Sequence, residues 1–245
     1  VWSLPENSQE VDTDTIPYFP TREFAEHTDA VWGLAFDARR SLLVSVGADN
    51  ACHVWSTDAK LKSQPLRRTL PELASTPTAT CFVMEDAMQF AVAYANSGIN
   101  VYDSETGQLV ASQPPPHELP ASAQLQVQRS QVVTRIRSST DHNVLAASVS
   151  DGSVRLVDTR TMKPTSRSKI MAHEGYVATS VDVGSNTLVT GGSDGIVRWW
   201  DWRNTKCAFE VVAHLRKGHE GVGDVGFVGR QVASAGGDSA IKLFK

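Results

Sequence analysis

The chain has 245 residues, of which 41% are hydrophobic and 20% charged, a composition that indicates a folded globular domain rather than a disordered segment. Its net charge of −4 gives no general attraction to nucleic acid or to an anionic membrane, and no apolar run reaches the roughly 18 residues of a membrane-spanning helix. Its three cysteines form no CxxC pair, which argues against a zinc site or a disulfide framework and favours a cytoplasmic protein without metal or cofactor.

Five β-rich runs recur along the chain, and each closes with an aromatic or large apolar residue. They are ACHVWS at 51–56, INVYD at 99–103, SVRLVD at 153–158, IVRWWD at 196–201 and AIKLF at 240–244. The closing residues Trp55, Tyr102, Val157, Trp200 and Phe244 are separated by 47, 55, 43 and 44 residues. A WD-repeat blade has a period of roughly 40–45 residues. We therefore expect an all-β WD-repeat β-propeller with five blades, which span about 22–58, 66–105, 125–160, 169–203 and 208–245.

The segment VWSL at residues 1–4 has the pattern of the end of a return strand. Propellers close by pairing their first and last strands, and an open set of blades would leave unpaired sheet edges. We therefore expect these blades to be part of a ring of about seven blades, within the range that propellers use.

Polar residues recur at fixed places within this apolar pattern. Aspartates stand six residues before the closing residue in four repeats, and a hydroxyl residue stands four residues before three of these aspartates. A buried Trp offers an N–H donor, and buried His, hydroxyl and Asp groups all need partners, so we expect hydrogen-bonded tetrads. The expected members are His27, Ser45, Asp49 and Trp55 in the first blade, His173, Thr190, Asp194 and Trp200 in the fourth, and His214, Ser234 and Asp238 in the last.

The same residue types form the catalytic triad of hydrolases. A set that is repeated from blade to blade with a Trp attached favours a structural role, because an enzyme needs only one triad. We therefore expect no catalytic residue and no enzyme activity. A propeller hydrolase remains the alternative, and it would need convergent catalytic side chains at the central mouth of the ring, where the sequence shows none.

Two repeats depart from the pattern. The second lacks the histidine and has Asn96 in place of the aspartate, and the third has Asp151 but closes with Val157. We expect this middle part of the propeller to be softer and its amide hydrogens to exchange fastest.

Several features have two interpretations. His214 is favoured over His219 as the tetrad member of the last blade. Trp32 is a candidate anchor for a protein partner, with core packing as the alternative. SQPPPHELPAS at 112–122 is extended and is either a surface loop or a docking ligand for an aromatic groove. The basic clusters within 60–68 and 163–169 are solvated loops, with phosphate contact as the alternative.

Several segments resemble the striatin family. EHTDAVWGLAF at 26–36 is similar to the third blade of that family, and the preceding residues 1–24 are similar to its long connection before that blade. NTKCAFEVVAHLRKGHEGVGDVGF at 204–227 and QVASAGGDSAIKLF at 231–244 resemble its last blade. The resemblance implies blades three to seven of a seven-blade propeller, and it is weak through residues 60–150.

This resemblance implies a noncatalytic scaffold and regulatory subunit of protein phosphatase 2A. The expected partners are phosphatase 2A subunits, germinal-centre-type kinases and Mob-like proteins, with calmodulin reached only through segments outside this chain. No nucleic acid and no integral membrane span are expected. The alternative is an unrelated WD-repeat adaptor, such as a ubiquitin-ligase substrate receptor or a ribosome-assembly factor.

Overall fold

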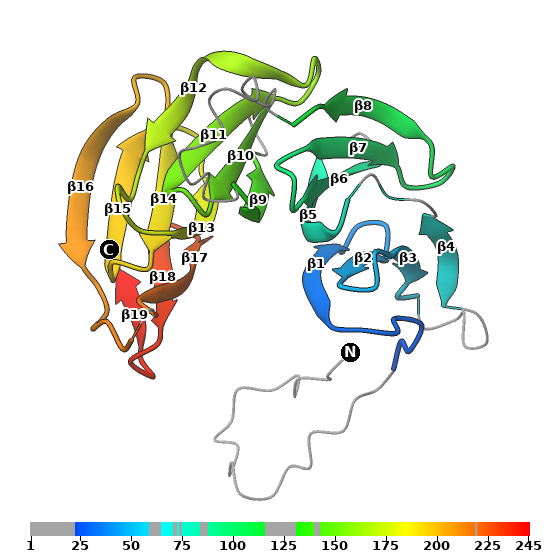
Figure 1. Cartoon of the computed structure of the whole chain (residues 1–245), viewed down its shortest axis with the longest axis horizontal. Coiled ribbons are helices and arrows are strands. Elements are labelled where there is room, and N and C mark those ends of the chain that lie inside the picture. Colours follow the sequence, from blue (N-terminus) through cyan, green and yellow to red (C-terminus); the bar gives the residue numbers. More distant parts are fainter. Residues whose placement is uncertain are drawn as a thin grey trace, which may run out of the picture.

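The computed structural model of this protein describes residues 23–58, 65–70, 73, 75–83, 88–115, 131–139, 143–218 and 220–245, and every regular element among them is a β-strand. The strands form five antiparallel sheets arranged along an arc (Figure 1). The first sheet contains β1 (Val31–Asp37), β2 (Leu42–Gly47), β3 (Cys52–Ser56) and β4 (Leu66–Leu70). The second contains β5 (Pro77–Val83), β6 (Gln89–Tyr94), β7 (Ile99–Asp103) and β8 (Leu109–Gln113). The prediction of an all-β WD-repeat propeller is confirmed.

The remaining sheets repeat this up-and-down order. The third contains β9 (Val133–Ser138), β10 (Val144–Val149), β11 (Ser153–Asp158) and β12 (Lys163–Met171). The fourth contains β13 (Ala178–Val183), β14 (Thr187–Gly192), β15 (Ile196–Asp201) and β16 (Lys206–Val212). The fifth contains β17 (Val222–Val228), β18 (Gln231–Gly236) and β19 (Ile241–Phe244). We call these sheets blades 1 to 5.

The blades are displaced along the chain relative to the sequence repeats. The outer strand β4 pairs with β3, so blade 1 takes its last strand from residues 66–70, which the sequence pattern assigned to the second blade. The same displacement places β8 beyond residue 105. The reason is that the closing residue lies near the end of the third strand of the sheet, and a fourth strand, which follows it in the chain, completes the sheet as an antiparallel hairpin partner.

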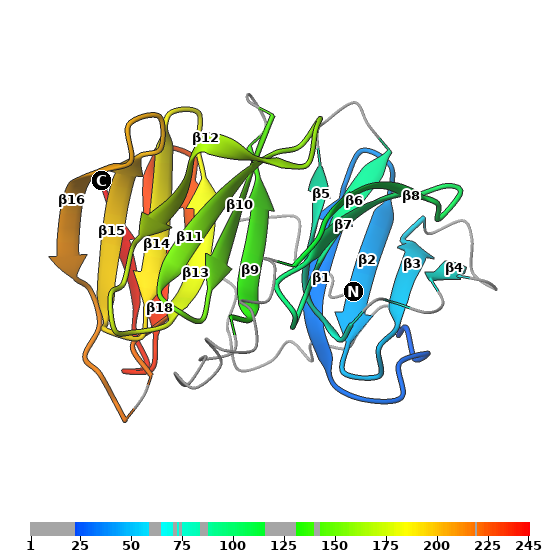
Figure 2. The same cartoon turned by 45° about the horizontal axis from the view of Figure 1, so that its top comes forward.

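The hydrophobic core lies between the blades. The middle strands are buried on both faces, as the pattern of β2 and β6 shows, which explains their continuous apolar sequences. Four clusters of buried side chains each draw residues from two neighbouring blades. Successive inner strands, β1, β5, β9, β13 and β17, contact one another along the arc, and Figure 2 shows how the first four follow one another.

Two glycines fix the turn of one blade against the entry loop of the next. Gly195, at φ 81°, and Gly152, at φ 86°, both lie in the left-handed region that favours glycine. A Cβ atom added to Gly195 would lie 2.3 Å from the His214 carbonyl oxygen, and one added to Gly152 would lie 2.0 Å from the His173 carbonyl oxygen. The Gly195 carbonyl accepts the His214 amide at 2.9 Å. Each turn therefore positions the histidine of the following blade.

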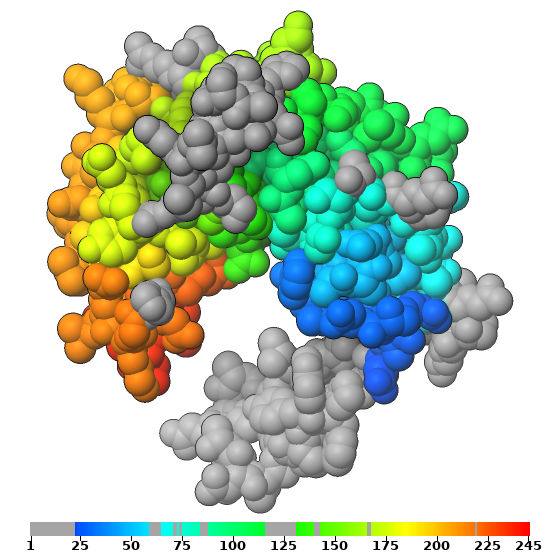
Figure 3. Space-filling model, in the orientation of Figure 1, coloured from blue at the N-terminus to red at the C-terminus, as the bar shows by residue number. Residues whose placement is uncertain are grey.

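The two ends of the arc do not meet in the view of Figure 3. At one end Trp32, Leu34 and Phe36 of β1 are exposed by 51%, 59% and 60%. At the other end Ile241 and Leu243 of β19 are exposed by 79% and 62%. The two end faces thus present apolar side chains, whereas faces between blades bury theirs. No helix in the described part of the chain is long and apolar enough to cross a bilayer.

Candidate functional site

The structure brings the four predicted tetrad residues of blade 1 together. His27, on the loop before β1, places Nδ1 2.9 Å from Asp49 Oδ2 and Nε2 2.7 Å from Ser45 Oγ. Trp55 Nε1 donates to Ser45 Oγ at 2.8 Å. The Asp49 carboxylate also accepts the backbone amides of Thr28 and Ala51. One chain of hydrogen bonds therefore links the entry loop, β2, the following turn and β3.

Blade 4 repeats this geometry with greater burial. His173 Nδ1 lies 3.0 Å from Asp194 Oδ1, and its Nε2 lies 3.0 Å from Thr190 Oγ1. Trp200 Nε1 donates to the same hydroxyl oxygen at 3.1 Å. Arg198 adds a guanidinium, which donates from Nη1 to Asp194 Oδ2 at 2.7 Å. His173 and Thr190 are both fully buried.

Blade 5 contains a three-membered version. His214 Nδ1 lies 2.8 Å from Asp238 Oδ1, and Nε2 lies 2.7 Å from Ser234 Oγ. The closing residue here is Phe244, which has no N–H to donate and packs at 5.4 Å between ring centroids on Trp199. His214 thus lies in the place predicted for the tetrad histidine, and His219 lies outside the described residues.

The tetrad carboxylates are held in the ionised form. Burial raises the pKa of Asp194, but hydrogen bonds from His173 and Arg198 outweigh it and lower the pKa to about 2. In Asp49 burial is likewise outweighed, chiefly by the Thr28 amide and His27, so its pKa is also lowered. The hydrogen bond from His214 lowers the pKa of Asp238. An ionised acceptor forms stronger hydrogen bonds, which favours tightly closed loops.

Blades 2 and 3 use other polar groups. In blade 2 the hydroxyls of Tyr94 and Tyr102 lie 2.8 Å apart, and Asn100 donates to Tyr102 Oη at 3.1 Å. In blade 3 Asp151 pairs with Lys169 at 3.2 Å and accepts the Ser153 amide at 2.9 Å. The tyrosine network was not predicted, because no other repeat has tyrosines at these positions, although Tyr102 stood out as a closing residue.

A second missed feature lies two residues before the closing residue of each blade. Aligning the repeats on that residue places a basic side chain there in four of the five blades. The five residues at this position are His53, Asn100, Arg155, Arg198 and Lys242. The signal was visible in the sequence once the closing residues had been aligned.

The tetrads do not have the properties of a catalytic site. Each hydroxyl oxygen in blades 1 and 4 already meets both the histidine and the Trp N–H, and it lies on a buried strand. A nucleophile has to approach its substrate, and these oxygens have no open side to offer one. The geometry instead ties a loop, a turn and two strands into one unit.

The exposed features lie elsewhere on the molecule. Trp32 is half-exposed on the end face of blade 1. Between blades 1 and 2 a cavity of about 310 Å³ has a mixed lining of three arginines, one acidic, one hydroxyl and two apolar residues: Arg40, Arg67, Arg68, Glu105, Ser104, Leu42 and Met88. Arg67 and Arg68, from the basic cluster of residues 60–68, thus line this cavity. Lys60 and Lys62 of that cluster lie outside the described residues, as do residues 116–122 of the proline-rich segment.

Comparisons with known proteins agree with this architecture. The family described as WD domain, G-beta repeat matches residues 19–56, 122–158 and 164–201. Human striatin-3 is 26% identical over 248 residues, which cover 99% of this chain and 30% of the relative. The chain is a striatin-like WD-repeat region. Human striatin-4 is 26% identical over 251 residues, 99% of this chain and 31% of the relative, and human striatin is 27% identical over 224 residues, 89% of this chain and 27% of the relative.

The resemblance to the striatin family is thereby confirmed, and it extends through the middle of the chain, where the sequence analysis found it weak. The chain spans about 30% of the length of these curated relatives. The WD-repeat match and these striatins both indicate a WD-repeat protein.

Proposed function

We propose that this striatin-like propeller is a noncatalytic scaffold in a phosphatase 2A–kinase complex, where it holds several protein partners at fixed positions. The observation that carries the proposal is the similarity to striatins over 99% of the chain. The structure supports a scaffold because cores between blades and the tetrads make the arc rigid, leaving its outer surfaces for contacts. The proposed location is the cytoplasm.

Affinity purification of the full-length protein tests this function. We expect it to recover the scaffold and catalytic subunits of phosphatase 2A, germinal-centre-type kinases and Mob-like proteins. A full-length protein that folds and oligomerises normally, yet recovers no phosphatase subunit, would remove the proposal. Recovery of ubiquitin-ligase or ribosome-assembly components in their place would favour the alternative WD-repeat adaptor.

We further propose that the two apolar end faces pack against additional blades of a seven-blade ring. Trp32, Leu34 and Phe36 alternate along β1, so they share one face. The opposite face of β1 meets blade 2, where a Cβ atom added to Gly33 would lie 3.2 Å from Ala79 Cα. This exposed face is apolar, like the faces that are buried between neighbouring blades, so it is suited to pack against another blade.

The variant Trp32→Ser in the full-length protein separates the two interpretations of this side chain. If Trp32 packs against a blade, the variant lowers the melting temperature, because a large buried aromatic is lost at a cost of about 3 kcal/mol. If Trp32 anchors a partner, the melting temperature stays the same and one partner is lost from the purified complex. Loss of a partner at unchanged stability would therefore contradict the packing role.

A further inference from the structure

His53 lies beside the tetrad of blade 1 with one ring nitrogen left over. Its side chain is on β3, two residues before Trp55, and is only 5% exposed. Nδ1 lies 2.9 Å from Thr69 Oγ1 on β4. Nε2 is buried and has no hydrogen-bond partner among the described residues. An unpaired buried nitrogen costs free energy, and native structures rarely leave one without a reason.

The equivalent position in blade 4 shows what normally occupies this place. Arg198 stands two residues before Trp200, and its guanidinium lies 2.7 Å from the tetrad carboxylate of Asp194. In blade 5 Lys242 stands at the same position and donates to the Ala213 carbonyl. These side chains carry a fixed positive charge. In blade 1 the same position holds the buried imidazole of His53, which carries no fixed positive charge.

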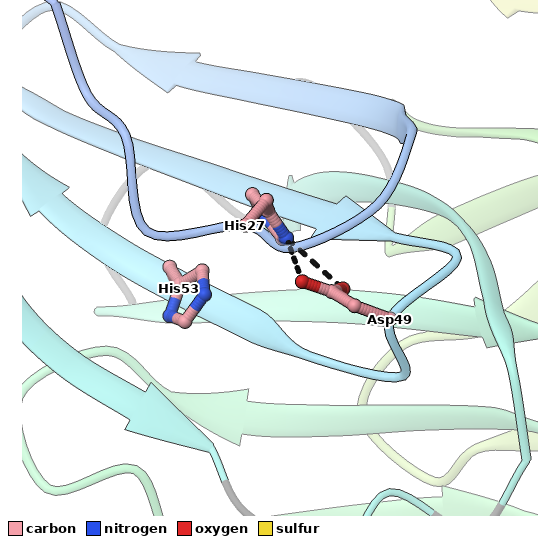
Figure 4. A group of neighbouring side chains, drawn as sticks. All are labelled: His27, Asp49 and His53. Atoms are coloured by element: carbon pink, nitrogen blue, oxygen red, sulfur yellow. Dashed lines mark hydrogen bonds and ion pairs between the residues drawn. The ribbon is translucent and has the colours of Figure 1, made fainter.

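Three potential metal ligands meet at this point. His27, Asp49 and His53 each offer one donor atom, and these atoms all lie within 4.8 Å of one another. Figure 4 shows the carboxylate of Asp49 next to His27, with a ring nitrogen of His53 facing the pair. The two histidine rings are in edge contact, with centroids 4.4 Å apart. Two imidazoles and a carboxylate are a donor set typical of Zn²⁺ with one open position.

The three donor atoms must move slightly closer together to bind one metal ion, because they now lie up to 4.8 Å apart. At metal–ligand distances of about 2.0–2.1 Å, tetrahedral ligands lie roughly 3.3 Å apart. The His27–Asp49 pair is already at 2.9 Å, so His53 makes most of the movement. A metal ion on Nδ1 requires the single ring proton of neutral His27 to be on Nε2, so this proton passes from Nδ1 to Nε2 by exchange with solvent and the Nε2–H donates to Ser45 Oγ, 2.7 Å away. The Ser45 hydroxyl would then orient the His27 ring, as hydrogen-bond acceptors commonly do for the second nitrogen of a metal-binding histidine.

We propose that His27, Asp49 and His53 form a binding site for a divalent transition-metal ion, with Zn²⁺ the best fit. The metal supplies in blade 1 the positive charge that Arg198 supplies in blade 4. It also pairs the unpartnered nitrogen of His53 and joins His27 to Asp49 through the ion. The site goes beyond the scaffold role, and the scaffold proposal does not depend on it.

The test is a Zn²⁺ titration of the untagged, metal-stripped protein, followed by calorimetry and by thermal unfolding with and without Zn²⁺. The exposed thiol of Cys207 is removed in every sample by Cys207→Ser, because a free thiolate also binds zinc. We expect one equivalent of Zn²⁺ to bind and to raise the melting temperature, since a ligand that binds only the folded state stabilises it.

Three variants make the result specific. His53→Gln removes one ligand and should weaken Zn²⁺ binding by about 100-fold or more. Loss of a residue that only supports a ligand already lowers metal affinity by up to about 100-fold. His53→Arg copies blade 4, and it should bind no Zn²⁺ while unfolding at or above the temperature of the metal-free parent. Arg198→Gln, the matched control in blade 4, should leave Zn²⁺ affinity unchanged.

Two outcomes would overturn the proposal. The parent protein could fail to bind Zn²⁺ or to gain thermal stability from it, or His53→Gln could bind Zn²⁺ as tightly as the parent. Because His53 is not a member of the tetrad, both His53 variants keep the hydrogen bonds of His27, and circular dichroism checks that they are folded. Partner recovery by the His53 variants reports separately on the scaffold function.

Discussion

Blades 2 and 4 build the same antiparallel sheet with different polar chemistry. In blade 4 the network runs from Asp194 in a turn through His173 on the entry loop to Thr190 in β14, which accepts the Trp200 N–H from β15. In blade 2 the network of Tyr94, Asn100 and Tyr102 stays within the sheet, on β6 and β7, and Ser112 on β8 donates to Asn100 Oδ1 at 2.7 Å. The sheet therefore does not require a tetrad. What the tetrad adds is a connection from the sheet to the loop and turn at its edge.

The largest expected difference between the two blades is in the free energy of unfolding lost when the hydrogen-bond acceptor in the turn, Asp194 or Asn96, is removed. Asp194→Ala strands His173 and Arg198, so we expect a loss of about 3 kcal/mol in the free energy of unfolding. Asn96→Ala, at the matching position of blade 2, removes one hydrogen bond to the Gly98 amide and should cost about 1 kcal/mol. Urea unfolding of both variants measures the difference. Equal losses would mean that the tetrad adds nothing to blade 4.

Acid should weaken blade 4 before blade 2. The pKa of Asp194 is about 2 in the folded protein, below its ordinary value of 3.8, so the unfolded chain binds more protons between these values. Its stabilising contribution is complete above pH 3.8 and is lost as the pH falls toward 2. Blade 2 has the neutral Asn96 at this position. Amide-exchange protection factors of β14 and β15 should therefore fall in acid more than those of β5 and β6, and a parallel decline would contradict the assignment.

The repeat pattern was sufficient to predict the fold and most of the tetrad geometry, because spacing along a repeat translates directly into position in a sheet. His27 is 18 residues from Ser45 and 22 from Asp49 in sequence, yet it meets both within hydrogen-bond distance, as the spacing implied. The tyrosine network was not predictable in this way, since it occurs once. The neighbourhood of His53 also required coordinates, because a search for CxxC pairs cannot detect ligands that a sheet brings together.

The softness expected of the middle blades can be tested within the tyrosine network. The side chains of Tyr94 and Tyr102 are 1% and 9% exposed, and this burial argues against a loose blade 2. Tyr94→Phe and Tyr102→Phe should each cost about 1–2 kcal/mol, because the other buried hydroxyl then keeps only its contact with Asn100. The double variant should cost less than the sum by about 1 kcal/mol. Additive losses in a double-mutant cycle would show that the 2.8 Å contact contributes no coupling.

The smallest expected loss of stability comes from making blade 4 resemble blade 5, where Phe244 stands in place of the tryptophan. Trp200→Phe removes one N–H donor, but Thr190 keeps its contact with His173, so we expect a loss of about 1 kcal/mol. Thr190→Val removes the hydroxyl that both neighbours share, and it should cost about twice as much because His173 and Trp200 are both left unpaired. Thermal or urea unfolding ranks the two variants. If Trp200→Phe were the more damaging, the tryptophan would act through packing in the cluster it shares with Leu188, and the hydrogen-bond chain would end at the hydroxyl, as it already does in blade 5.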